Sequence, residues 1–325
     1  MRMDKIIQHI KSGQHLLIAS HAEPDGDAVG CLIALGVALR EFGKKTTLYN
    51  SSPIPAVYRF LPGVEQIARQ IEPADTYDVA IMLDCGDLVR VGEAASAISQ
   101  IATIINIDHH VSNTGFGHIQ LIDTTACATA EIVYRLIRAL EIPFDRTMAT
   151  SLYTGILTDT GSFRFSNTNK AAFSISKEMT AIGVDPHGVA QHVFGSYSLG
   201  RIKLLNMALN SIEISDNGKL SMMTVTRSML NTTGTNTEDL DGMINYARRI
   251  EDVRVAALIH EIQNGGGKFA NMNHYHVSLR SDSSVDVAKI ASKFGGGGHA
   301  SAAGFQIEST LVALKTKIIT LAEDL

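Results

Sequence analysis

Short apolar segments with almost no polar alternation are the feature that most constrains how this chain can fold. Examples are HLLIAS (residues 15–20), DVAIMLDC (78–85) and ATIINID (102–108). A strand with one solvent-exposed face alternates apolar and polar residues, whereas a strand of a parallel sheet is covered on both faces and is apolar throughout. Residues 28–42 predict a helix that Gly43 closes just after its C-terminus. The N-terminal part of the chain is therefore predicted to be α/β, with a doubly wound, mainly parallel sheet.

The pattern changes after a predicted linker helix at residues 196–213. Before it, TTLYN adds a strand, and helices are expected at 126–140, 146–158, 169–182 and 186–194. After it, we expect strands in LSMMTVT, VRVAALIHEI, HYHVSLRS and AAGFQIE, helices near 236–248, 285–293 and 309–323, and a turn in NGGGKF. The predicted domains are thus residues 1–195 and, beyond the linker helix, a smaller α/β domain with a mixed sheet at residues 214–325.

The composition of the 325 residues disfavours several classes of function. A net charge of -5 and a pI of about 6.2 argue against a large surface for duplex nucleic acid, which needs a positive field, but leave a short anionic ligand open. Cys31, Cys85 and Cys127 form no CxxC pair, so a reducing compartment is expected, without a disulfide framework or a zinc–thiolate site. With no secretory core and no apolar stretch of roughly 18 residues, we expect a cytoplasmic protein without a membrane span. The sequence leaves open whether the chain forms a homodimer.

Aspartate and histidine gather where the predicted strands end. HAEPDGD follows the first strand, LDCGD and DHH close two later ones, and Asp159 in TDTGSF closes a helix. Ligands of a doubly wound sheet bind at the carboxyl ends of its strands, and so many carboxylates repel one another unless cations neutralise them. Oxygen ligands with a few imidazoles favour two divalent ions, Mn²⁺ or Mg²⁺ more than Zn²⁺. Two ions about 3.5–4 Å apart suit phosphoryl chemistry.

Each motif alone also has an ordinary structural explanation. DGD is common in turns, paired histidines occur at surfaces and in cores, Asp84 at a strand end could cap a helix, and DTG could be a loop. Their joint placement at predicted strand ends favours a metal site.

The motifs together resemble a known family. HAEPDGD, LDCGD, DHH and TDTGSF, in this order and at this spacing, resemble the four motifs of the DHH phosphoesterases. FGGGGHASAAGF resembles the glycine-rich signature of the DHH-associated substrate domain. The resemblance covers nearly the whole chain. In architecture the chain is similar to stand-alone RecJ-like members, the nano-RNases or bifunctional oligoribonuclease and 3′-phosphoadenosine 5′-phosphate (PAP) phosphatases.

The resemblance implies a role for each polar residue of these motifs. The implied metal ligands are His21 and Asp25 for a first ion, Asp27, His109 and Asp159 for a second, and Asp84 as a bridge between the two. His110 would face the phosphate or the attacking water and would not bind metal. Asp108 would orient a ligand imidazole and fix its tautomer.

In the second domain the resemblance implies residues that hold the substrate. Arg280 in VSLRS matches a substrate-gripping arginine of the family, although from the sequence alone it also fits an ordinary surface position on a strand. The glycines of the signature would let backbone N–H groups approach an anion, as in phosphate-cradling loops, with the next histidine in contact. These residues are Gly295, Gly296, Gly297, Gly298 and His299. Arg164, just beyond Asp159, would reach the same phosphate.

The implied activity is that of a two-metal phosphoesterase that cuts very short single-stranded RNA, or a small nucleotide such as PAP, to mononucleotides. A water between the metals would attack phosphorus in line, and the second domain would grip the substrate across a cleft that the linker helix opens and closes. Hydrolysis of linear or cyclic dinucleotides and an exopolyphosphatase reaction stay open. A pyrophosphatase is disfavoured by the GGGGH segment, which that family lacks. A catalytically inactive nucleotide sensor is disfavoured because all six ligand positions carry ligand residues.

Overall fold

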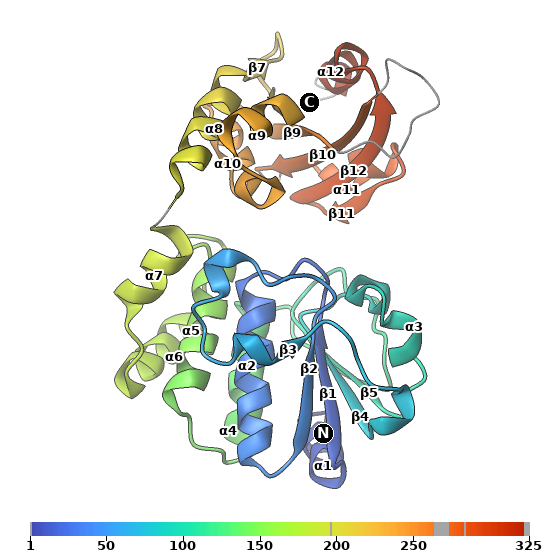
Figure 1. Cartoon of the computed structure of the whole chain (residues 1–325), viewed down its shortest axis with the longest axis vertical. Coiled ribbons are helices and arrows are strands. Elements are labelled where there is room, and N and C mark those ends of the chain that lie inside the picture. Colours follow the sequence, from blue (N-terminus) through green and yellow to red (C-terminus); the bar gives the residue numbers. More distant parts are fainter. Residues whose placement is uncertain (1, 196, 263–272, 283, 322–325) are drawn as a thin grey trace. The chain divides into compact units, whose positions relative to one another are not determined.

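The computed structural model describes residues 2–195, 197–262, 273–282 and 284–321, without the side chain of His299. The chain divides into two compact units, Met1–Ser196 and Tyr197–Leu325 (Figure 1). The turn expected in NGGGKF, residues 264–269, lies outside the described residues. Within the described ranges, no helix has both the length and the apolar character to cross a lipid bilayer.

The first unit is built on a six-stranded parallel sheet in the order β3-β2-β1-β4-β5-β6. The strands are β1 (His15–Ser20), β2 (Lys45–Tyr49), β3 (Ile67–Ala68), β4 (Val79–Leu83), β5 (Ile104–Asp108) and β6 (Ile119–Ile122). Every residue of β1, β4 and β5 is buried, so the predicted α/β fold with a sheet covered on both faces is confirmed. The sequence did not predict β3 and β6, because short, half-buried edge strands carry little pattern.

Helices cover both faces of this sheet. They are α1 (Arg2–Ser12), α2 (Gly26–Glu41), α3 (Ala95–Ile98), α4 (Thr129–Ala139), α5 (Arg146–Asp159), α6 (Lys170–Ile182) and α7 (Pro186–Phe194), with short 3-10 helices at Ala56–Tyr58, Val64–Gln66, Ala74–Thr76 and Leu88–Val91. The core between the sheet and α1, α2 and α4–α7 is the larger one, and α3 packs on the opposite face. Helix α2 begins two residues earlier than predicted because the Asp25 carboxylate accepts the N–H groups of Asp27 and Ala28, each at 3.0 Å.

Two glycines let α2 and α5 approach each other closely. A Cβ on Gly30 in α2 would lie 2.3 Å from the carbonyl oxygen of Ser151, and a Cβ on Gly155 in α5 would lie 2.8 Å from a carboxylate oxygen of Asp27. A side chain at either position would push the helices apart. The contact therefore brings the start of α2, which carries Asp27, close to the end of α5, which carries Asp159.

The second unit has a six-stranded sheet in the order β11-β12-β10-β9-β8-β7. Its strands are β7 (Glu213–Ile214), β8 (Leu220–Val225), β9 (Val255–Glu261), β10 (Asn273–Ser281), β11 (Gly297–His299) and β12 (Ala302–Ser309). Its helices are α8 (Leu199–Asn210), α9 (Arg227–Thr233), α10 (Ile244–Arg248), α11 (Val287–Ser292) and α12 (Leu311–Thr320), with a 3-10 helix, η5, at Thr237–Leu240. Strands β8 and β9 pair parallel and the other described pairs are antiparallel, so the predicted mixed sheet is confirmed.

Two predicted helices differ from the structure. The helix expected near 236–248 is broken into η5 and α10, because Gly242 between them takes the left-handed φ of 76° that ends a regular helix. The helix expected as a linker is α8, and its residues Leu204 and Ala208 are buried beside β8. Helix α8 is therefore part of the core of the second unit.

Candidate active site

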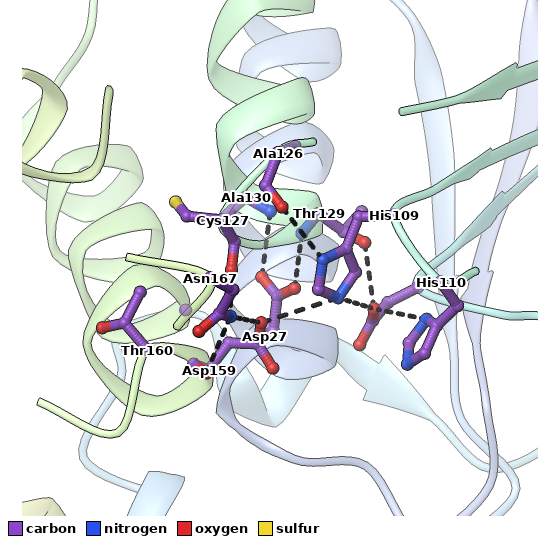
Figure 2. A network of polar contacts seen from close by, with 12 residues as sticks. Asp27, His109, His110, Ala126, Cys127, Thr129, Ala130, Asp159, Thr160 and Asn167 are labelled. Atoms are coloured by element: carbon purple, nitrogen blue, oxygen red, sulfur yellow. Dashed lines mark hydrogen bonds and ion pairs between the residues drawn. The ribbon is translucent and has the colours of Figure 1, made fainter. Parts of the chain in front are cut away.

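The residues predicted as metal ligands converge at the carboxyl ends of β1, β4 and β5 and at the facing ends of α2 and α5. Three groups of side chains offer ligand atoms that lie within 4.8 Å of one another: His21, Asp25 and Asp84; Asp27, His109 and Asp159; and Asp84, His109 and His110. The first two groups, called set one and set two below, match the division that the resemblance implies. Figure 2 shows set two, with Asp27, His109 and Asp159 turned toward one another.

Asp84 belongs to set one and also faces His109 of set two. It follows β4 with a left-handed φ of 53°, which aspartate adopts more readily than most residues, and its side chain is 2% exposed. Its Oδ2 lies 3.5 Å from Nε2 of His21, and its Oδ1 lies 3.8 Å from Nε2 of His109. The two oxygens of Asp84 thus face the imidazoles of different sets.

Backbone carbonyl groups orient both of these imidazoles. Nδ1 of His21 lies 2.8 Å from the carbonyl oxygen of Ala22, and Nδ1 of His109 lies 3.3 Å from that of Ala126. A carbonyl oxygen only accepts, so each hydrogen bond places the proton on Nδ1. In the neutral rings Nε2 is then unprotonated and faces the carboxylates, which is the tautomer that a metal ligand requires.

Asp108 has a different partner from the one expected. The resemblance implied that it orients a ligand imidazole, but its Oδ1 accepts from Nδ1 of His110 at 2.7 Å and from the backbone N–H of His109 at 2.8 Å. Its Oδ2 accepts from Asn113 at 2.6 Å. Asp108 does not orient the ring of His109 because that ring faces the carbonyl oxygen of Ala126. Asp108 binds the ring of His110 instead. Although burial opposes the charge, the hydrogen bond that His110 donates to Asp108 raises the pKa of His110 to about 9.

The start of α4 holds Asp27 in place. Oδ2 of Asp27 accepts the N–H of Thr129 at 2.6 Å, and Oδ1 accepts that of Ala130 at 2.9 Å (Figure 2). The capping residue of α4, Ala128, has no side chain that could accept these groups, so Asp27 satisfies them and gains from the positive end of the helix dipole. The hydroxyl of Thr129 also donates to Oδ1 of Asp84 at 2.9 Å. The sequence predicted neither contact. The one local feature that could have indicated them is Ala128, which precedes α4 and has no side chain that can cap the helix.

The carboxylates of the site repel one another. Burial, followed by the charge of Asp84, raises the pKa of Asp27 well above its ordinary value. Burial also raises the pKa of Asp159 to about 7, against the favourable charge of His109. Burial acts on Asp84 in the same direction, but the attraction of the neighbouring imidazoles, that of His21 first, outweighs it and lowers the pKa of Asp84. Because the donors are carboxylates and imidazoles without a thiolate, the residues fit hard divalent cations, which would relieve this repulsion.

The chain makes a tight turn directly after Asp159. Residues 161–163 take left-handed φ values of 56°, 61° and 61°, a conformation that is strained for serine and phenylalanine. Asn167, beyond the turn, donates to Oδ2 of Asp159 at 3.0 Å (Figure 2). Arg164 is exposed, and its Nε donates to the carbonyl oxygen of Gly161 at 2.6 Å. The turn therefore fixes Asp159 and places Arg164 close to it along the chain.

The glycine-rich signature of the second unit forms a strand where a loop was expected. Gly297, Gly298 and the backbone of His299 make up β11, which pairs with β12; the side chain of His299 lies outside the described part. A Cβ on Gly296 would lie 2.2 Å from the carbonyl oxygen of Gly304. The signature thus has a packing role, because side chains would keep the backbone away from β12.

Models of known families match both units. The model described as "DHH family, N-terminal domain" matches residues 15–156, and the one described as "DHHA1 domain" matches residues 221–324. The chain belongs to the DHH family, as the resemblance of its motifs implied, and it is a hydrolase of phosphoester bonds.

Individual relatives extend over most of the chain. The bifunctional oligoribonuclease and PAP phosphatase NrnA of Thermus thermophilus is 33% identical over 290 residues, which are 89% of this chain and 83% of the relative. The protein of the same name from Bacillus subtilis is 23% identical and covers 94% of this chain and 93% of its own length. An exopolyphosphatase-related protein from Bacteroides fragilis has the same fold, with a TM-score of 0.88 at 24% identity over 98% and 95% of the two chains. Exonuclease RecJ bound to manganese gives a TM-score of 0.55 at 13% identity over 100% and 95%.

Replacing Thr129 with valine should weaken metal binding. The change removes the hydroxyl that donates to Asp84 but keeps the side-chain shape and the backbone N–H that holds Asp27. Loss of a group that orients a ligand costs about ten- to a hundred-fold in metal affinity, and we expect a loss of that size for Mn²⁺ in isothermal titration calorimetry. Thr129→Ser keeps the hydroxyl and is the matched control. Equal affinities of the valine variant and the wild type would mean that Asp84 is held without this contact.

Proposed function

We propose that this protein is a metal-dependent phosphoesterase that hydrolyses very short single-stranded RNA and PAP to mononucleotides. The proposal depends above all on the two adjacent ligand sets, of which Asp84 belongs to one and faces His109 of the other, because two cations held side by side suit the attack of water on phosphorus. The substrate class is supported by relatives that carry the name bifunctional oligoribonuclease and PAP phosphatase.

The six clustered residues would hold the cations. In this proposal the first cation is held by His21, Asp25 and Asp84, and the second by Asp27, His109, Asp159 and Asp84. We propose Mn²⁺ as the native ion. Mg²⁺ is the alternative, because it also prefers oxygen ligands. When bound, such ions acidify water and neutralise the charge that develops on the phosphoryl group.

His110 acts on the phosphate in this proposal. Asp108 fixes its ring through Nδ1, and Asn113 in turn fixes Asp108. The hydrogen bond to Asp108 keeps a proton on Nδ1 and favours the positively charged ring. A cationic group fixed beside the phosphate stabilises the negative charge of the transition state without having to reorient.

The remaining predicted residues would bind the nucleotide. Arg280 and His299, with the backbone of Gly296, Gly297 and Gly298, would hold it in the second unit, and Arg164 would contact a phosphate from the first. We propose accordingly that residues 1–195 perform the chemistry and residues 214–325 bind the substrate, with residues 196–213 as the connection.

A panel of substrates tests the proposed function. The full-length chain, supplied with Mn²⁺, is incubated with di- to pentaribonucleotides, PAP, a cyclic dinucleotide, pyrophosphate and polyphosphate, and the products are separated by anion exchange. We expect mononucleotides from the RNA and AMP from PAP, with kcat/KM roughly a hundred-fold or more above that for pyrophosphate. Release of phosphate from polyphosphate that outpaces hydrolysis of every nucleotide would assign the site to polyphosphate.

Replacing His110 with alanine should separate chemistry from metal binding. We expect kcat on a diribonucleotide to fall about 10²–10³-fold, as for other fixed groups that stabilise transition-state charge, while the metal content stays that of the wild type. His187→Ala, an exposed position in α7, is the control and should change neither quantity. Loss of one metal ion in the His110 variant would make His110 a ligand, as its place in the group with Asp84 and His109 also permits.

A further inference from the structure

Arg280 lies on the face of the second sheet that helix α10 covers. Along β10, Tyr275, Val277 and Leu279 are buried in the core that includes α11 and α12. Side chains alternate along a strand, so Arg280 points to the opposite face. Helix α10 packs on that face through contacts with β9 and β10.

Arg248, the last residue of α10, lies near Arg280. Ile244 and Ala247 of α10 are buried in the cluster that contains Ala256 of β9, and Ala256 is the direct cross-strand neighbour of Arg280. Burial lowers the pKa of Arg280; the charge of the nearby Asp241 opposes this change, and the charge of Arg248 adds to it. Two guanidinium groups therefore share one partly buried environment.

Among the residues that the structure describes, no carboxylate forms an ion pair with either guanidinium, although Asp241 lies near enough to attract Arg280. Nη1 of Arg280 donates to its neighbour's carbonyl, that of Leu279, at 3.0 Å. Nε of Arg248 is buried and makes no hydrogen bond. The unpaired Nε of Arg248 opposes folding, and so does the repulsion between the two guanidinium groups. A single bound anion would remove both penalties.

We propose that Arg248 and Arg280 form one anion subsite that takes a terminal phosphate monoester of the nucleotide substrate. Two guanidinium groups suit a monoester, which carries a charge of about -1.5 to -2 at pH 7, better than an internal diester with a single charge. This inference rests on the proposed function, because PAP and 5′-phosphorylated short RNA both end in such a group. It adds Arg248, whose position on α10 no sequence motif marked, to the residues that select the substrate.

Binding in the presence of EDTA tests the subsite apart from the metal centre. The probes are diadenylate with and without a 5′-phosphate, pApA and ApA, titrated into the full chain by calorimetry. Wild type should bind pApA more tightly than ApA. Arg248→Ala should lower the affinity for pApA by about ten- to a hundred-fold and leave that for ApA within about two-fold, as expected for the loss of a charge-assisted hydrogen bond.

Neighbouring substitutions sharpen the comparison. Arg249→Ala removes the adjacent, exposed guanidinium and should leave both affinities unchanged. Arg248→Lys should restore only part of the pApA affinity, because lysine is a point charge and not a planar fork. If Arg248→Ala lowers the melting temperature so far that the chain unfolds, Arg248→Met keeps the apolar stem and should show the same selective loss.

Two results would overturn the subsite: equal affinity losses for pApA and ApA, or an Arg248 variant that behaves like the Arg249 variant. Failure of the proposed function looks different. If wild type with Mn²⁺ hydrolyses no nucleotide but still binds pApA in an Arg248-dependent way, the subsite stands and the proposed activity falls. If it hydrolyses short RNA and Arg248→Ala leaves pApA binding intact, the activity stands and the subsite falls.

Discussion

The repulsion among buried carboxylates at the strand ends of the first unit is the constraint on which the rest of the structure depends. Asp84, almost fully buried, faces the imidazoles of His21 and His109, and Asp27 faces the free N–H groups at the start of α4. Each contact offsets part of the cost of burying negative charge. Burial and the neighbouring charge of Asp84 still raise the pKa values of Asp27 and Asp159, and we propose that divalent cations neutralise the remaining repulsion.

The fold supplies the geometry for this arrangement. Parallel strands end at one edge of the sheet, so residues far apart in sequence meet there. The glycine contact between α2 and α5 brings Asp27 and Asp159 together, and the left-handed turn at residues 161–163 ends α5 directly behind Asp159. The second unit has a different sheet and its own core.

Much of this was predictable from the sequence, because apolar strands and the polar residues that end them are local patterns. The parallel sheet and the clustering of His21, Asp84 and His109 follow from that pattern. The role of Thr129 and the partner of Asp108 were not predictable, because both depend on contacts between segments distant in sequence or on the rotation of one ring. The strand at residues 297–299 was missed because glycine carries no strand signal until β12 lies beside it.

Metal content is the most direct test of a centre built around Asp84. The full chain and its Asp84→Asn variant are equilibrated with Mn²⁺, freed of excess by gel filtration, and analysed by inductively coupled plasma mass spectrometry. Asparagine tolerates the left-handed backbone at this position but lacks the charge. If this carboxylate holds an ion in each of the two ligand sets, wild type should retain roughly two ions per chain and the variant fewer than one. A variant that keeps both ions, or a wild type that binds a single one, would contradict a shared two-metal centre.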